Sequence, residues 1–588
     1  MDALFKTTQA RQFAVALYVL VSAFSFIPFF YIPAAYEKAL LIPHNIFIWI
    51  VPGFAVFCAL WRVYKSSSLI LPLEFKRILS FGLLMLAGSA VSSWSSTEGW
   101  FYNGIFLLSG PVFLFSLHQF KPSSRVLHNV LYIILAGLLL HATVALLQVL
   151  PGRLLYALIP HPAKPEPLGV FAQRNNLASA MVTGIVLSLY LCSTPGFRGR
   201  PLSLKGIVFA ALFGCSMIVM MTGSRVGLLS FVIAVPLMLA ARYKQFKLRP
   251  LVFVAVIFTL GSGSGVGVAT SDGLWVATSK LERLADEGRD ARQHVYAISW
   301  DIFTDQPLIG HGIGSFQHVF HDRAAEYLER EGGEPLIGHD RFSHPHNEIL
   351  LWAIEAGILA VIGIAVLILA VIMQLYRIGW QRGGAMAALL VPIALHTQVE
   401  LPFYYSHYHW FLFLFLAYLL FKPFSKTLRL KCSRTMLSVA PVVGGLIFIS
   451  VLLFCISTFK TSRDLTTLLY YHDVNLEELR AAQSHPYFGD FATLLTHQVL
   501  LNTDLKNGTN QSVYDYVAWA ENYLDSVPDV NTYHNLALAY YYIGNNEMME
   551  KTVAQGLYFF PKHPVILSVY ERAKLFEPYP EHYIEKAH

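Results

Sequence analysis

The sequence predicts an all-α polytopic integral membrane protein with a large polar loop and a soluble, helical C-terminal domain. Only 14% of its 588 residues are charged and 55% are hydrophobic, whereas a soluble domain carries about 25% charged residues. Long apolar runs alternate with short basic segments, and two long polar stretches stand apart from them. The net charge of +6 follows this alternation, so it does not indicate a nucleic-acid partner.

Thirteen apolar runs approach the length that spans a bilayer, each of roughly 17–25 residues. They lie at about 13–33, 44–61, 78–94, 101–117, 127–149, 177–193, 206–222, 226–241, 250–269, 349–375, 384–400, 408–421 and 436–459. Because the run at 408–421 is short and the break at 223–225 fits either a kink or a turn, eleven or twelve spans are alternatives.

Basic residues predict the orientation of these spans. With the N-terminus inside, every inside segment contains Lys or Arg, while the outside segments 95–100 and 401–407 contain neither. An excess of Lys and Arg marks the cytoplasmic loops of membrane proteins. We therefore expect a cytoplasmic N-terminus and an outside C-terminus.

This orientation divides the chain into four parts, the second and fourth of which lie outside. They are helices 1–9 at 1–269, a polar loop at 270–347, helices 10–13 at 348–459 and a soluble domain at 460–588. In the last part, residues 531–561 resemble a tetratricopeptide helix pair, with Gly544 at the turn and Pro561 after the second helix. A structural cap and a docking surface for a protein acceptor fit this domain equally well.

Amides and one arginine stand where the sixth span begins. Gln173, Arg174 and Asn175 follow a proline-rich outside segment, and they suit hydrogen bonding to hydroxyls or phosphates. A helix start in which Asn175 caps the backbone amides is the structural alternative, and it is favoured when this motif is taken alone.

Arg225 lies between two apolar runs in the sequence Thr222-Gly-Ser-Arg. An arginine close to the hydrocarbon is costly unless it faces a cavity or a partner, and guanidinium binds phosphate in a bidentate manner. We favour this role over snorkelling of the side chain to the interface.

The polar loop contains seven histidines, a glycine-rich turn and two arginines just before that turn that are candidate anion ligands. Arg289 and Arg292 precede the turn at 307–316. This turn lacks the Lys-Ser/Thr of a nucleotide loop and is expected to be architectural, so Arg292 is the better anion ligand.

His344, His346 and Asn347 run directly into the tenth span. A neutral imidazole can accept a proton from a hydroxyl near neutral pH, which suits His346, whereas His344 also fits a plain loop residue. No zinc-type spacing accompanies the histidines, and no metal or cofactor is expected.

Glu400 closes the eleventh span, and His396 lies one helical turn before it. A carboxylate at this depth requires a partner, and residues four apart share a helix face. A structural pair and a functional role fit equally well.

Taken in order, these motifs resemble the O-antigen ligase and polymerase superfamily, and within it the bacterial O-linked protein oligosaccharyltransferases that glycosylate pilins. The resemblance runs from about residue 150 to 420. It rests on Gly169, Gln173 and Asn175, on Thr222 to Arg225, on Arg292, Pro307, Gly310, Gly312 and Phe316, on His346 to Glu348, and on His396, Glu400 and Pro402. Tyr296 is a departure, because many relatives have tryptophan there.

The resemblance implies a ligase fold of the GT-C-like kind in the bacterial inner membrane, with the polar loop and the C-terminal domain in the periplasm. The donor would be an undecaprenyl-diphosphate oligosaccharide, and the acceptor a Ser or Thr hydroxyl of a secreted protein such as a type IV pilin. His346, Arg225 and Arg292 would be catalytic. Substrate-binding roles would fall to Gln173, Arg174, Asn175, Arg289, His344, Asn347 and Glu400.

Two other functions compete with this one. An O-antigen ligase or polymerase would use a glycan or lipid A core acceptor, and it would have no need of the helical tail. A transporter of lipid-linked glycan would favour internal repeats and midplane charges, whereas the motifs here gather at one face.

Overall fold

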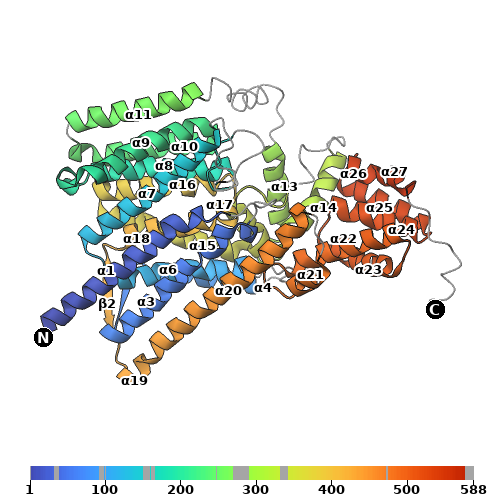
Figure 1. Cartoon of the computed structure of the whole chain (residues 1–588), viewed down its shortest axis with the longest axis horizontal. Helices are drawn as coiled ribbons and strands as arrows, with labels where there is room; N and C mark the ends of the chain where they lie inside the picture. The colour runs from blue at the N-terminus through green and yellow to red at the C-terminus, as the bar shows by residue number, and fades with distance from the viewer. Residues whose placement is uncertain are drawn as a thin grey trace. The chain divides into compact units, whose positions relative to one another are not determined.

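The computed structural model describes residues 2–31, 39–91, 99, 101–149, 159, 166–171, 173–246, 248–268, 291–330, 342–471 and 475–575 (Figure 1). The chain forms two compact units. The core unit comprises Met1–Gly82, Leu107–Gly288 and Ile364–Thr466. The loop-tail unit comprises Leu83–Phe106, Arg289–Gly363 and Thr467–His588.

A long helix overlaps each of the thirteen predicted apolar runs. These helices are α1 (Asp2–Phe26), α3 (Ile50–Ser66), α4 (Phe75–Val91), α6 (Leu107–Phe120), α7 (Ser124–Val149), α8 (Arg174–Cys192), α9 (Leu202–Thr222), α10 (Arg225–Arg242), α11 (Leu248–Val268), α15 (Glu348–Ile378), α16 (Trp380–His396), α18 (His407–Phe421) and α20 (Val439–Tyr471). Shorter helical turns accompany them: η1 (Ile27–Phe29), η2 (Ala39–Leu41), α2 (Pro43–Phe47), η3 (Phe101–Phe106), η4 (Pro195–Gly199), η5 (Tyr243–Gln245), α17 (Pro402–Tyr405) and α19 (Arg434–Leu437).

Within the described residues, eight helical stretches have the length and apolar composition needed to cross a membrane. They are Ala10–Phe29, Pro43–Ser66, Ser124–Val149, Arg174–Cys192, Leu202–Thr222, Arg225–Gln245, Glu348–Ile378 and Arg434–Leu469. Three shorter apolar helices add to them at Gly104–Phe120, Phe253–Gly267 and His407–Phe421. The prediction of an all-α polytopic membrane protein is confirmed, while the count of thirteen spans stays a prediction.

Helix α8 is the central element of the core unit. Helices α7, α9, α10 and α16 all pack against it, and 83% of its most apolar stretch is buried. Gly227 of α10 allows one of these close contacts, because a Cβ atom there would lie 2.6 Å from the Cβ of Ala178 on α8. The first turns of α8 and α10 are therefore held side by side.

The sequence break after Thr222 separates two helices. Gly223 has a left-handed backbone (φ 57°) and ends α9, while Ser224 caps α10 by accepting a hydrogen bond from Gly227 N at 3.1 Å. Of the two alternatives, the structure has a turn. Arg225 consequently becomes the first residue of a helix.

A small antiparallel sheet joins β1 (Ser68–Pro72) to β2 (Ser425–Arg429) in the core unit. Beside it, the buried carboxylate of Glu74 pairs with Arg77 and Arg377. Burial alone would raise the pKa of Glu74, but hydrogen bonds from the two arginines outweigh it and lower the pKa. The pair thus ties the segment before α4 to the end of α15.

The loop-tail unit contains α13 (Ala291–Asp305), α14 (Phe316–Arg330) and the beginning of α15. The glycine-rich turn between α13 and α14 is hydrogen-bonded to the α15 backbone: His311 N donates to Ile354 O at 2.8 Å, and Ile358 N to Pro307 O at 2.8 Å. Gly357 breaks the helical geometry of α15 (φ 68°), and a Cβ there would meet Leu308 O at 2.5 Å. The turn therefore braces the start of α15.

The tail is an array of antiparallel helices around α24 (Figure 1). Its helices are α21 (Leu476–Gln483), α22 (Gly489–Asn507), α23 (Gln511–Ser526), α24 (Val530–Tyr542), α25 (Asn546–Phe559), α26 (Pro564–Leu567) and α27 (Val569–Ala573). Side chains of Asn475, Asp529 and Asn545 cap α21, α24 and α25. Its likeness to tetratricopeptide repeats stays a prediction.

Candidate functional site

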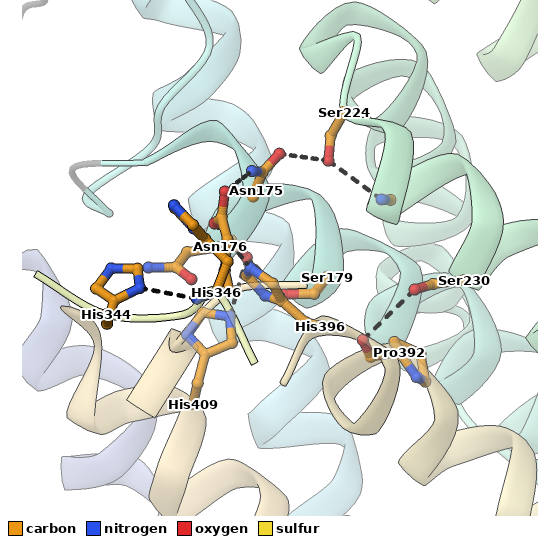
Figure 2. Close-up of polar contacts among 12 residues, drawn as sticks. Asn175, Asn176, Ser179, Ser224, Ser230, His344, His346, Pro392, His396 and His409 are labelled. Atoms are coloured by element: carbon orange, nitrogen blue, oxygen red, sulfur yellow. Dashed lines mark hydrogen bonds and ion pairs between the residues drawn. The ribbon is translucent and has the colours of Figure 1, made fainter. Parts of the chain in front are cut away.

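Asn175, in the first turn of α8, links two other elements of the core unit (Figure 2). Its Nδ2 donates to Glu400 Oε1 at 2.6 Å, and its Oδ1 accepts from Ser224 Oγ at 2.7 Å. The residue that precedes α8 is Gln173, and the Asn175 side chain caps no backbone amide. The capping interpretation of Asn175 is therefore wrong, since its amide makes tertiary contacts instead.

The hydrogen bonds of this group fix the direction in which the protons point. Gly227 N–H is only a donor, so Ser224 Oγ accepts from it and gives its own proton to Asn175 Oδ1. The amide nitrogen of Asn175 is then turned toward the Glu400 carboxylate. The N-terminus of α10 thereby orients the hydrogen bond from Asn175 to Glu400, although these two residues are 225 positions apart in the sequence.

The second carboxylate oxygen of Glu400 faces a buried histidine. Its Oε2 lies 3.3 Å from His396 Nε2, and His396 Nδ1 lies 3.0 Å from Ser179 Oγ on α8. The side chain of His396 is fully buried, whereas 12% of the Glu400 side chain is exposed. We call Ser224, Asn175, Glu400, His396 and Ser179 the Asn175 network.

His409, near the start of α18, extends the polar contacts below this network (Figure 2). Its Nε2 lies 2.9 Å from the carbonyl oxygen of Asn176, which also accepts from Ser179 Oγ at 3.1 Å, and its Nδ1 lies 2.8 Å from Ser406 Oγ. A carbonyl oxygen only accepts, so Nε2 carries the proton and Nδ1 accepts from Ser406. Four helices, α8, α10, α16 and α18, thus meet through one set of polar side chains.

Two arginines flank the Asn175–Ser224 hydrogen bond in sequence. Arg174 is the first residue of α8 and Arg225 the first residue of α10. Neither side chain makes a hydrogen bond or an ion pair with the described part of the chain, and Arg225 is exposed. Helix N-termini favour anions because their first backbone amides are unpaired and the dipole is positive there.

Gln173 has an unpaired group beside these arginines. Its side-chain Oε1 is buried and has no hydrogen-bond partner within the described residues. A buried polar atom without a partner costs about 1–3 kcal/mol, so this oxygen is suited to accept a hydrogen bond from a ligand. The predicted residues Gln173, Arg174, Asn175, Arg225 and Glu400 are thus brought together by the α8–α10–α16 contacts.

For the two arginines predicted to bind anions in the polar loop, the structure describes no side chain. Arg289 lies outside the described residues. Arg292 lies in the first turn of α13, where only the backbone is described. The predicted anion-binding role of both arginines stays a prediction.

His346 adopts an uncommon backbone conformation just before α15. Its φ of 54° is left-handed, which non-glycine residues seldom adopt outside constrained sites. His346 N donates to His344 Nδ1 at 3.2 Å, and the two rings meet edge to face at 4.5 Å (Figure 2). Asn347 caps α15 through a bond from Leu350 N at 3.0 Å, so His346 is anchored from both sides.

Contacts inside the loop-tail unit connect α15 to the tail. Glu355 of α15 accepts from Phe316 N at the start of α14, at 3.4 Å. On α14, Gln317 Nε2 donates to Pro528 O at 3.3 Å, and the buried His321 ring packs on Phe560 at 4.9 Å. The tail, α14 and the segment of His346 therefore form one continuous set of contacts.

Sequence reasoning missed Ser179, His409 and Glu355. Ser179 could have been found because it follows Asn175 by one helical turn on an otherwise apolar span. His409 and Glu355 gave no comparable signal, since their partners come from other helices. In the described ranges, no group of three or more His, Cys, Asp or Glu side chains is arranged to hold a metal ion, and the expected metal-independent chemistry stays a prediction.

Two protein-family models match the chain. A family model described as O-Antigen ligase matches residues 209–365, and another described as Virulence factor membrane-bound polymerase, C-terminal, matches residues 385–571. Together they cover more than half of the chain. The chain belongs to the O-antigen ligase and polymerase superfamily. No curated protein matches the chain.

The two family matches contain different residues of the predicted site. The first contains Arg225 and His346, and the second contains His396, Glu400 and most of the tail. Membership indicates a multi-pass membrane enzyme that transfers glycosyl groups. The expected superfamily is therefore confirmed, while the protein-glycosylating branch stays a prediction.

Proposed function

We propose that this enzyme transfers an oligosaccharide en bloc from undecaprenyl diphosphate to Ser or Thr hydroxyls of a periplasmic protein, a type IV pilin or a pilin-like protein. The observation that carries the donor assignment is the pair Arg174 and Arg225 beside the Asn175–Ser224 hydrogen bond, because neither side chain has a partner among the described residues. Two guanidinium groups and two helix N-termini match the charge and the oxygen atoms of a diphosphate.

The proposed reaction exchanges one bond at the anomeric carbon of the glycan. The acceptor oxygen forms a bond to that carbon, the bond to the diphosphate oxygen breaks, and the acceptor proton passes to His346. The diphosphate leaves with the bonding electrons, and Arg225, Arg174 and Arg292 offset its negative charge without a metal ion. His346 acts on the acceptor and the arginines act on the donor.

In this proposal the Asn175 network positions the donor. Both oxygens of Glu400 are engaged, one by Asn175 and the other by His396, so the carboxylate is fixed while part of it stays exposed. Gln173 and the exposed part of Glu400 would bind glycan hydroxyls. Arg289, His344 and Asn347 complete the proposed substrate contacts in the loop.

The proposed setting is the bacterial inner membrane, with the N-terminus in the cytoplasm. The loop at 270–347 and the tail at 460–588 would then lie in the periplasm, on the side where Asn175 and Arg225 are predicted. This proposal rests on the basic residues of the inside segments.

A second candidate is an O-antigen ligase or polymerase that acts on a glycan or a lipid A core acceptor. The descriptions of both matching family models favour it. The helical tail favours the protein acceptor, because its contact with α14 connects a large soluble surface to the segment of His346.

Intact-mass measurement of pilins separates the two candidates. Pilins would be co-expressed with a lipid-linked glycan pathway and with either the wild-type enzyme or His346→Ala, and His128→Ala would control for the loss of a ring that bonds only to Ser124 O in the described chain. We expect a glycan-sized mass increase that disappears only in His346→Ala. Unmodified pilins together with a lipid A core that gains polymer would establish the ligase candidate instead.

A further inference from the structure

The tail contains a polar pocket that the proposed transfer reaction does not use. Its volume is about 510 Å³, and it lies between α22, α24 and the short helices α26 and α27. Its lining includes Gln498, Asn531, His534, Asn535 and Arg572. The apolar core of the tail is a separate cluster that includes none of these residues.

Several polar groups of this pocket have no partner in the described chain. The His534 side chain is buried (3% exposed), and its Nε2 has no hydrogen bond. Arg572, Asn531 and Gln498 make no side-chain hydrogen bond or ion pair with the described residues. Unpaired buried polar atoms are uncommon, so His534 Nε2 indicates a ligand. Arg572 and Asn531 are exposed at the same pocket and are accessible to that ligand.

The proton of the His534 ring can be assigned. Its Nδ1 lies 3.1 Å from Asn535 Oδ1, an acceptor, so Nδ1 is the donor. Burial lowers the pKa of His534 most strongly, and Arg572 lowers it further, while the bond to Asn535 opposes both. The neutral ring therefore presents Nε2 as an acceptor for a ligand N–H or O–H group.

The amides of the pocket have the spacing of an extended peptide. Asn531 and Asn535 are four residues apart on α24, a rise of about 6 Å, and two residues of an extended chain span about 6.6 Å. An amide side chain offers a donor and an acceptor, as a peptide unit does. Among the described residues, Arg572 is the only charged side chain in the lining. Its positive charge favours a ligand that carries a carboxylate.

We propose that this pocket binds an extended peptide segment that carries a carboxylate, with Arg572 on the carboxylate and Asn531 and His534 Nε2 on the peptide backbone. The inference rests on the proposed function only in one respect, namely that the protein containing this peptide segment would be the acceptor of the glycan. The pocket would raise the local concentration of acceptor hydroxyls without contacting the reacting atoms.

Fluorescence anisotropy on the full-length protein in nanodiscs tests this proposal. The probes are two fluorescein-labelled nonapeptide pools, with Gly, Ala, Ser, Thr and Val mixed at eight positions and either Glu or Gln at the centre. We expect the Glu pool to bind about tenfold more tightly than the Gln pool, as one charge-assisted hydrogen bond implies. Arg572→Gln should remove this preference, and Asn531→Ala should weaken both pools.

Lys574→Gln is the matched control. It also removes one positive charge, and it lies two residues after Arg572, but the Lys574 side chain pairs with Glu571. Equal binding of the two pools, a preference that survives in Arg572→Gln, or no binding of either pool would overturn the proposal. Glycan transfer measured on the same preparations reports separately on the proposed function, so either can fail while the other stands.

Discussion

The Asn175 network and the tail pocket contain similar side chains in opposite states. In the network, Ser224, Asn175, Glu400, His396 and Ser179 bond to one another in series. In the pocket, His534 Nε2 and the side chains of Asn531 and Arg572 have no partners in the described chain.

The difference separates two ways of recognising a ligand. Polar groups that satisfy one another in a low-dielectric setting form a rigid support, which suits a reaction that needs fixed geometry. Unpaired groups around an open pocket are completed only when a ligand arrives. We therefore interpret the network as a rigid support. Arg174 and Arg225, which are adjacent to Asn175 and Ser224 in the sequence, are the groups at its edge that are available to bind the donor.

Removal of Arg225 should have the largest effect, because it is one of these edge groups. We expect Arg225→Ala to lower glycan transfer by about 100-fold or more, as loss of one transition-state donor does elsewhere. Arg225→Lys should recover only part of the rate, since an ammonium cannot bind phosphate in a bidentate manner. The readout is the initial rate of transfer from a purified lipid-linked donor.

Arg198→Ala is the control for Arg225→Ala. Arg198 is also exposed, and its side chain also lacks a partner in the described chain, but it lies in η4 on the predicted inner side. Equal losses in the two variants would show that general surface charge, and not the α10 N-terminus, supports the reaction.

Exchanging the amide of Asn175 for a carboxylate, and the carboxylate of Glu400 for an amide, should reveal the energetic coupling between these two residues. Asn175→Asp places two carboxylates where a 2.6 Å hydrogen bond now lies, so we expect a loss of transfer of roughly 10- to 100-fold. Glu400→Gln alone should cost less, and the double variant should transfer faster than Asn175→Asp. A double-mutant cycle measures this coupling. Purely additive effects would argue against a connected network.

Gly227→Ala should loosen the scaffold without touching a polar group. The added Cβ would lie 2.6 Å from the Cβ of Ala178, and overpacking of this kind costs about 1–3 kcal/mol. We expect lower thermal stability and reduced transfer. Gly206→Ala on α9, where a Cβ would meet nothing within 4 Å, is the control and should lower neither, because alanine favours a helix more than glycine does.

The smallest expected effect concerns the pH response of the tail. Burial lowers the pKa of His485 to about 4, and its Nδ1 accepts from Tyr487 N at 3.1 Å and Phe488 N at 3.2 Å. The neutral ring thus stabilises the fold fully above the unfolded pKa of about 6.5, and this stability is lost as the pH falls toward 4. Between pH 7 and 5 we expect a loss of roughly 1–2 kcal/mol, seen as faster hydrogen exchange in α21 and α22.

His485→Asn tests the origin of that response. An asparagine oxygen can accept from the same backbone amides but does not titrate. The pH dependence of exchange should become flatter in this variant. An unchanged pH dependence would assign the effect to other groups.

The sequence predicts local features of this protein better than the site itself. Each of the thirteen apolar runs overlaps a described helix, and Gly223 and Ser224 mark the break before α10. The spacing of His396 and Glu400 anticipates their contact, because each of these signals is local. The sequence leaves open the alternative that Asn175 caps α8, because its actual partners, Ser224 and Glu400, lie far away in the sequence. Arg572 gave no signal for the same reason, since α24 and α27 meet only in the folded tail.

Competition by undecaprenyl diphosphate and by undecaprenyl monophosphate against the lipid-linked donor tests whether the edge of the Asn175 network binds the diphosphate. The assay compares the wild-type protein in nanodiscs with the Arg174→Ala/Arg225→Ala double variant. We predict that the wild type prefers the diphosphate by about tenfold or more and that the double variant loses this preference. An undiminished preference in the double variant would contradict the assignment of the donor to these two arginines.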